Sequence, residues 1–201
     1  MHVTTTPRSS ITPADTVNLL EDPILASSDE LFVGLSNGSP QIAFFGVSGP
    51  NAGSVSFTGN CSVTNPTSLN CNVPYTWAEG TSYDLDIART AKTSSTETWV
   101  GTVTNDSSHV STTVASVTVP ASWGDFTSNL SFLAVNYGNV ASCAAEPFLK
   151  TVWGPLMAET SKGTALVKGA VQSTYVSQCK ARTKVITTIG KVTGATIELG
   201  I

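Results

Sequence analysis

Charged side chains are scarce in this sequence, which holds ten Lys and Arg, 14 Asp and Glu and only two His among 201 residues. Charged residues make up 12% of the chain, about half of the usual share in a globular protein. The few basic residues form no dense stripe, so we do not expect the phosphate contacts on which nucleic-acid binding depends. Serine and threonine supply the polarity instead, and the 40% hydrophobic residues exclude a disordered chain.

Long apolar runs are also missing. No stretch approaches the roughly 20 residues that a helix needs to cross a bilayer, so we expect no integral membrane association. The first residues, Met1 and His2 followed by Val3 and three threonines, lack the basic and apolar regions of a secretory leader. We interpret the sequence as a mature form to which Met1 was added for expression.

The four cysteines occur without any C-x-x-C spacing, and His2 and His109 are the only histidines that could complete a metal site. A structural zinc site is therefore a poor fit. An even number of cysteines in a chain rich in Ser and Thr favours disulfides and a secreted, extracellular protein. Three pairings are open, and we favour Cys61–Cys71 together with Cys143–Cys179, because the first two flank a short loop that a hairpin could close. A cytosolic protein with reduced thiols is the alternative.

Signatures of catalysis and of bound metals are equally sparse. The sequence contains no G-x-S-x-G element, and a Ser-His-Asp triad would have to use His2, in an expected N-terminal arm, or His109, at a turn. The acidic pairs Glu21-Asp22 and Asp29-Glu30 are too isolated to predict a calcium site. We expect no metal and no other cofactor.

Short alternating segments separated by turns dominate what is present. Strands are predicted near 31–35, 41–47, 54–58, 83–88, 98–104, 110–119, 129–137, 183–189 and 195–199, and no convincing helix of ten residues appears. This spacing predicts an all-β, antiparallel β-sandwich, jelly-roll-like and stapled by disulfides. We expect an N-terminal arm over 1–28, with a turn of helix from Ala14 to Leu20, and a single sandwich domain over 29–201. Residues 159–201 are a candidate C-terminal extension.

An ordered set of motifs lies between Trp77 and Pro155. They are Trp77-Ala-Glu79-Gly80-x-x-Tyr83, Trp99-Val-Gly101-Thr-Val-Thr-Asn105-Asp106, Val117-Thr-Val-Pro120, Phe132 with Tyr137, Cys143 with Pro147, and Trp153-Gly-Pro155. The set resembles a sandwich domain of unknown function found in secreted bacterial and fungal proteins, where some relatives accompany carbohydrate-active or lectin-like modules. The resemblance begins near Leu31 and leaves out the first 28 residues and those beyond Glu159. It implies the fold and carries over no catalytic residue.

Aromatic and amide side chains are the candidate ligand-binding residues, because sugar C–H faces stack on aromatic rings while Asn and Asp bind hydroxyls. Trp77 and Trp99 stand among apolar neighbours and are expected in the core. Trp123 lies in a loop before Gly124, where we expect an exposed ring. The predicted ligand-binding set is Trp123, Asp125, Asn136, Tyr137 and Asn139.

Paired carboxylates offer a second kind of site. Asp84 and Asp86 share one face of a strand at about 7 Å, within the range that glycoside hydrolysis uses, although a solvated strand face explains them better. Glu79 and Glu97 are interpreted as ordinary loop or edge acids. The leading hypothesis is a secreted, non-catalytic glycan-binding module acting at a cell wall or cell surface. The alternatives are a secreted effector, elicitor or toxin acting on host cells or membranes, and a glycoside hydrolase with a carboxylate pair.

Overall fold

The computed structural model describes residues 2–6, 17–136, 149–154, 157–160, 163–166, 183–188 and 194–199. These residues form sixteen β-strands and two short 3-10 helices, η1 (Ala52–Ser54) and η2 (Ala121–Trp123). The strands are β1 (His2–Thr6), β2 (Val17–Leu25), β3 (Glu30–Ser36), β4 (Ile42–Ser48), β5 (Ser56–Thr58), β6 (Cys61–Asn65), β7 (Ser68–Pro74), β8 (Ser82–Lys92), β9 (Thr96–Asn105), β10 (Val110–Pro120), β11 (Phe126–Asn136), β12 (Leu149–Trp153), β13 (Met157–Thr160), β14 (Gly163–Leu166), β15 (Thr183–Thr188) and β16 (Gly194–Leu199).

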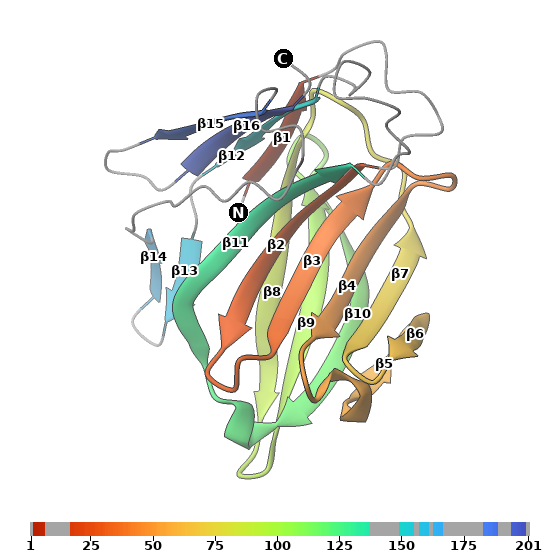
Figure 1. Cartoon of the computed structure of the whole chain (residues 1–201), viewed down its shortest axis with the longest axis vertical. Helices are drawn as coiled ribbons and strands as arrows, with labels where there is room; N and C mark the ends of the chain where they lie inside the picture. The colour runs from red at the N-terminus through yellow and green to blue at the C-terminus, as the bar shows by residue number, and fades with distance from the viewer. Residues whose placement is uncertain are drawn as a thin grey trace.

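Two antiparallel sheets pack face to face, which confirms the predicted sandwich (Figure 1). One sheet has the strand order β11-β2-β3-β4-β7-β6, and the other has the order β15-β16-β12-β1-β8-β9-β10-β5. In Figure 1, β2, β3, β4 and β7 lie in front of β8, β9 and β10. The strands β13 and β14 form a separate two-stranded sheet. No described helix is long and apolar enough to cross a membrane.

Alternating side chains build the core between the two sheets, as strand geometry requires. Along β9, Glu97, Trp99, Gly101 and Val103 are buried while the threonines between them are half-buried. Gly101 is required by packing, since a Cβ atom there would lie 2.3 Å from Cγ of Phe45, on β4 of the opposite sheet. The predicted core positions of Trp77 and Trp99 are confirmed, with 6% and 4% of their surfaces exposed.

The N-terminal region differs from the prediction. Residues 17–25 form β2, which pairs with both β11 and β3, so the predicted turn of helix is wrong over residues 17–20. The physical reason is the period-2 burial of Leu19, Glu21 and Leu25, which suits a strand with one face in the core. Residues 2–6 form β1, which pairs with β12 and β8; residues 7–16 lie outside the described part.

Both strands predicted near the C-terminus are present. β15 pairs with β16, and β16 pairs with β12, so these strands continue the eight-stranded sheet. The residues of the second predicted disulfide, Cys143 and Cys179, lie outside the described residues.

Candidate functional site

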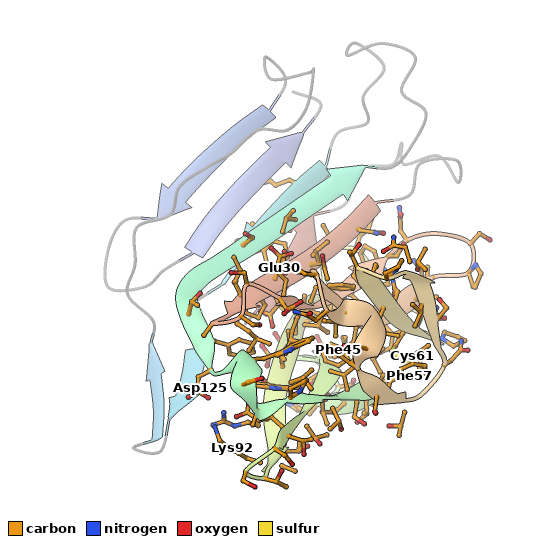
Figure 2. All side chains as sticks on the ribbon, turned by 60° about the horizontal axis from the view of Figure 1, so that its bottom comes forward. Glu30, Phe45, Phe57, Cys61, Lys92 and Asp125 are labelled. Atoms are coloured by element: carbon orange, nitrogen blue, oxygen red, sulfur yellow. A yellow bond between two sulfur atoms is a disulfide. The ribbon has the colours of Figure 1, made fainter. Side chains whose placement is uncertain are left out.

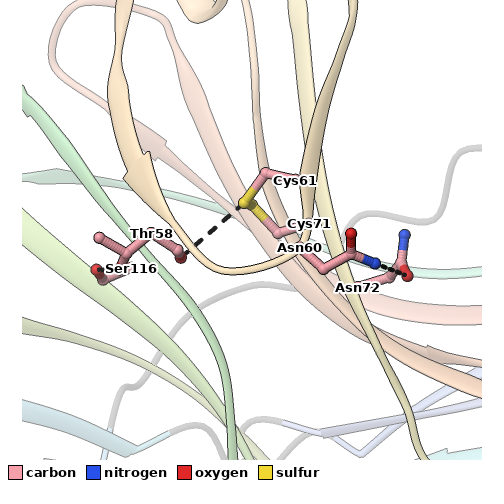
Figure 3. Close-up of a disulfide and its surroundings, with 6 residues drawn as sticks. All are labelled: Thr58, Asn60, Cys61, Cys71, Asn72 and Ser116. Atoms are coloured by element: carbon pink, nitrogen blue, oxygen red, sulfur yellow. Dashed lines mark hydrogen bonds between the residues drawn. A yellow bond between two sulfur atoms is a disulfide. The ribbon is translucent and has the colours of Figure 1, made fainter.

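The predicted disulfide between Cys61 and Cys71 is confirmed, with an S–S distance of 2.07 Å. Its cysteines face each other across the β6–β7 hairpin, so the segment read as a cysteine loop consists mainly of two paired strands (Figure 3). A second link follows directly, because the side-chain amide of Asn60 donates to Asn72 at 3.2 Å. The start of β6 is therefore fastened to β7 by a covalent bond and an amide pair.

A shallow groove lies beside this hairpin. It has a volume of about 510 Å³ and opens widely to solvent. The lining residues come from the η1 region, from the end of β6 and from the β6–β7 turn, and none of them carries a charge: Pro50, Asn51, Gly53, Ser54, Val63, Asn65 and Pro66. Val63 is one of the few exposed large hydrophobic residues of the described chain, with 47% of its surface exposed.

Backbone hydrogen bonds hold the two walls of the groove together. The amide of Gly49 donates to the carbonyl of Thr67 at 3.0 Å, and the amide of Gly53 donates to the carbonyl of Pro66 at 2.8 Å. Gly53 is needed for this approach, because a Cβ atom there would lie 2.8 Å from the same Pro66 oxygen. Ala52 between them is fully buried and anchors η1 in the core. The groove is therefore formed before any ligand arrives.

Asn51 presents a fixed hydrogen-bond acceptor. Its backbone amide and its side-chain Nδ2 donate to the two carboxylate oxygens of Asp29, at 3.1 and 3.2 Å. A carboxylate only accepts, so the nitrogen of the Asn51 side chain must face Asp29. Its Oδ1 has no hydrogen-bond partner among the described residues. Asp29 is itself fully buried, which makes this orientation costly to change.

Asn65 presents the complementary donor. Its Oδ1 accepts from the backbone amide of Thr67 at 2.8 Å and from the Thr67 hydroxyl at 2.7 Å. A backbone amide only donates, so the oxygen of the Asn65 side chain must face Thr67. Within the described chain, Nδ2 of Asn65 has no partner. The groove thus carries one acceptor and one donor whose roles are set by the protein.

Trp123 does not form the exposed platform that the sequence predicted. Only 5% of its surface is exposed, and it belongs to the core cluster. Backbone bonds pull this loop onto the β2–β3 turn: Ser27 donates to the Trp123 carbonyl at 3.0 Å, and Ala26 donates to the Asp125 carbonyl at 3.1 Å. The prediction of an exposed ring is wrong because these long-range bonds fold the loop inward.

Asp125, which Figure 2 labels, is by contrast exposed over 70% of its side chain. It forms an ion pair with Arg89. Nη1 of Arg89 also lies 3.3 Å from Oε1 of Glu97, and Nζ of Lys92 lies 2.5 Å from the same oxygen. Glu97 is only 1% exposed, so its interpretation as an ordinary edge acid is wrong. Its burial follows from its inward position on β9.

An aromatic stack lies directly beneath this charged cluster. The guanidinium of Arg89 sits 5.4 Å from the ring centre of Trp99, whose ring in turn lies 4.5 Å from that of Phe126. The hydrogen bond to Asp125 is the largest cause that raises the pKa of Arg89 above its usual value. Arg89 and Lys92 balance the charges of Glu97 and Asp125, although Oε2 of Glu97 is buried without a hydrogen-bond partner among the described residues. We interpret the cluster as a link between strands.

The remaining predicted ligand residues are not brought to the groove in the described structure. Asn136 is the last residue of β11 and pairs with Val17 of β2. Tyr137 and Asn139 lie outside the described residues. Neither Asp125 nor Trp123 lines the groove. The sequence signal that could have pointed to the groove is the pair of Asn residues next to prolines, Pro50-Asn51 and Asn65-Pro66.

Two carboxyl groups do meet on neighbouring strands. Burial is the main cause that raises the pKa of Asp22 on β2 to about 7, and the neighbouring carboxyl of Glu30 on β3 adds to it. Asp84 and Asp86 share a strand face as expected, opposite the buried Tyr83 and Leu85. Groups of three or more potential metal ligands are absent from the described part of the chain.

Comparison with protein-family models and with curated proteins gave no match for this chain. The groove must therefore be interpreted from its own chemistry.

Proposed function

We propose that this chain is a non-catalytic carbohydrate-binding domain that holds an uncharged glycan in the groove between η1 and the β6–β7 turn. The observation that supports it is the pairing of a fixed acceptor on Asn51 with a fixed donor on Asn65 over a lining of proline and valine. No carboxylate lines the groove, so the proposal is binding without hydrolysis.

The groove suits sugars for physical reasons. A sugar ring presents apolar C–H patches and a rim of hydroxyls, so it needs apolar contact area and a few oriented polar groups. Pro50, Val63 and Pro66 offer the apolar area, and the two asparagines offer the oriented groups. Because hydrogen bonds and the disulfide fix both walls, little conformational entropy is lost when a ligand binds. A shallow, open groove also accepts the interior of a long chain as readily as its end.

The disulfide supports an extracellular location as part of the same proposal. Disulfides persist in oxidising compartments and are rare in the cytosol. A glycan-binding domain outside the cell would meet cell-wall or cell-surface polysaccharides, which is where the proposed ligand is found.

The test is titration of the purified protein with a panel of neutral oligosaccharides, followed by calorimetry and by amide chemical shifts. Binding should perturb the backbone amide signals of residues 51–54, 63–65 and 67. The variant Val63→Glu places a charge in the groove and should abolish binding. Val110→Glu is the matched control, since Val110 is also an exposed strand valine, at 60% exposure, and does not line the groove. If no oligosaccharide binds the folded protein, or if both variants lose binding equally, the proposal is wrong.

A further inference from the structure

We infer that the groove selects sugars bearing an N-acetyl group, as in polymers of N-acetylhexosamine. This inference rests on the proposed function and names the ligand class of the same site. Two asparagines carry this inference. Asn51 uses one N–H of its side-chain amide on Asp29, which leaves Oδ1 and the second N–H for a ligand. Oδ1 of Asn65 already accepts twice from Thr67, so Asn65 offers a ligand only its N–H groups.

A locked donor and a locked acceptor match an amide better than they match hydroxyls. A hydroxyl can donate or accept, so a ligand made only of hydroxyls gains nothing from fixed roles. An acetamido group has fixed roles of its own, because its N–H only donates and its carbonyl only accepts. Asn51 Oδ1 can therefore accept from the ligand N–H, while Asn65 Nδ2 donates to the ligand carbonyl.

The rest of the lining fits the same group. The acetyl methyl needs apolar contact, which Pro50, Val63 and Pro66 provide, and burial of one such carbon adds measurable affinity. The lack of charged side chains in the lining argues against charged sugars as ligands. No cation lines the groove to hold a carboxylate or sulfate sugar. No anion lines it to hold a free amino sugar either, because the carboxylate of Asp29 is buried behind Asn51 and accepts from it.

Calorimetry with three trisaccharides tests the inference: the trimer of N-acetylglucosamine, its fully deacetylated form, and the trimer of glucose. We expect the acetylated trimer to bind about tenfold more tightly than either of the others, the equivalent of one additional good contact. If none of the three binds, the proposed function fails with the inference. If the glucose trimer binds as tightly as the acetylated one, glycan binding stands and the selectivity is wrong.

A pair of isosteric variants isolates the donor. Asn65→Asp keeps the oxygen that accepts from Thr67 but replaces the ligand-facing N–H by an oxygen, so affinity for the acetylated trimer should fall about tenfold. Asn105→Asp is the matched control. Oδ1 of Asn105 accepts from Ser107 and Ser108 at the β9–β10 turn, as Oδ1 of Asn65 accepts from Thr67, and it does not line the groove. Unchanged affinity in Asn65→Asp would overturn the inference.

Discussion

Replacing Glu21 by glutamine is expected to flatten the pH dependence of this domain's stability between pH 5 and pH 8. Glu21 points into the sandwich from β2 and is only 5% exposed. Burial above all raises the pKa of its carboxyl to about 8, a value that already includes the smaller effects of the nearby Asp86 and Asp84. In the unfolded chain the same group titrates near 4.5. At a pH between these two pKa values, the carboxyl of Glu21 holds a proton in the folded protein that it has released in the unfolded chain.

The sign follows from proton binding. Where the folded state binds more protons than the unfolded state, the free energy of unfolding falls as pH rises. The contribution of Glu21 is therefore complete below about pH 4.5 and is lost as pH rises towards 8. With 1.36 kcal/mol for each pKa unit, the loss between pH 5 and pH 8 is roughly 3–4 kcal/mol. That is a large fraction of the 5–15 kcal/mol by which typical domains are stable.

The measurement is urea unfolding at several pH values, followed by tryptophan fluorescence. The unfolding free energy of the wild type should fall by roughly 3–4 kcal/mol from pH 5 to pH 8 through Glu21. Glu21→Gln should keep only the smaller pH dependence that comes from the raised pKa of Asp22. Glu79→Gln, at an exposed residue, should behave as wild type. The comparison uses the slope of the unfolding free energy against pH, so any loss of stability from the glutamine that does not depend on pH cancels. Equal slopes for Glu21→Gln and wild type would refute the assignment.

Three further substitutions test other parts of the structure. Replacing Cys61 and Cys71 by serine should lower the unfolding free energy by at most about 3 kcal/mol, from the loop closed over ten residues, and loss of all cooperative unfolding would contradict this. Glu97→Ala should cost roughly 1–3 kcal/mol in urea melts, since it removes the buried partner of the partly exposed Arg89 and Lys92 while Arg89 keeps Asp125; a change below about 0.5 kcal/mol, as at ordinary surface sites, would show that the ion pairs are unimportant. Gly101→Ala should cost 1–3 kcal/mol or more, because the new Cβ would overlap the ring of Phe45, and a thermal midpoint equal to wild type would contradict that.

Alternation along the strands is the part of the fold that the sequence predicts best. Trp99 on β9 was expected in the core and is buried, and the alternation places Val103 on the same buried face, as it places Tyr83 and Leu85 on that of β8. These strands lie in long antiparallel pairs with one face in the core, so a period of two is visible in the residues themselves. The same reasoning failed for β2, because the first 28 residues show little periodicity and their prolines suggested an arm.

Contacts between distant residues explain why the site could not be predicted. Asn51 is oriented by Asp29, 22 residues earlier, and Asp125 pairs with Arg89, 36 residues earlier. Trp123 is buried by backbone bonds to the β2–β3 turn. None of these partners has a local sequence signal. Asn51 lies just before η1 and Asn65 ends β6, and only the fold shows that these two segments meet.

The position of the disulfide bears on what it stabilises. It joins β6 to β7 at the end of the six-stranded sheet, where β6 has a neighbour on one side only. The large core between the sheets does not depend on it, since the buried aromatic and aliphatic residues of β3, β4, β8 and β9 pack without it. A free edge strand would be the first to open by local unfolding. Val63 and Asn65, which line the groove, lie on this strand. The bond therefore stabilises the groove more than the fold, because it holds the described edge strand that lines the proposed binding site.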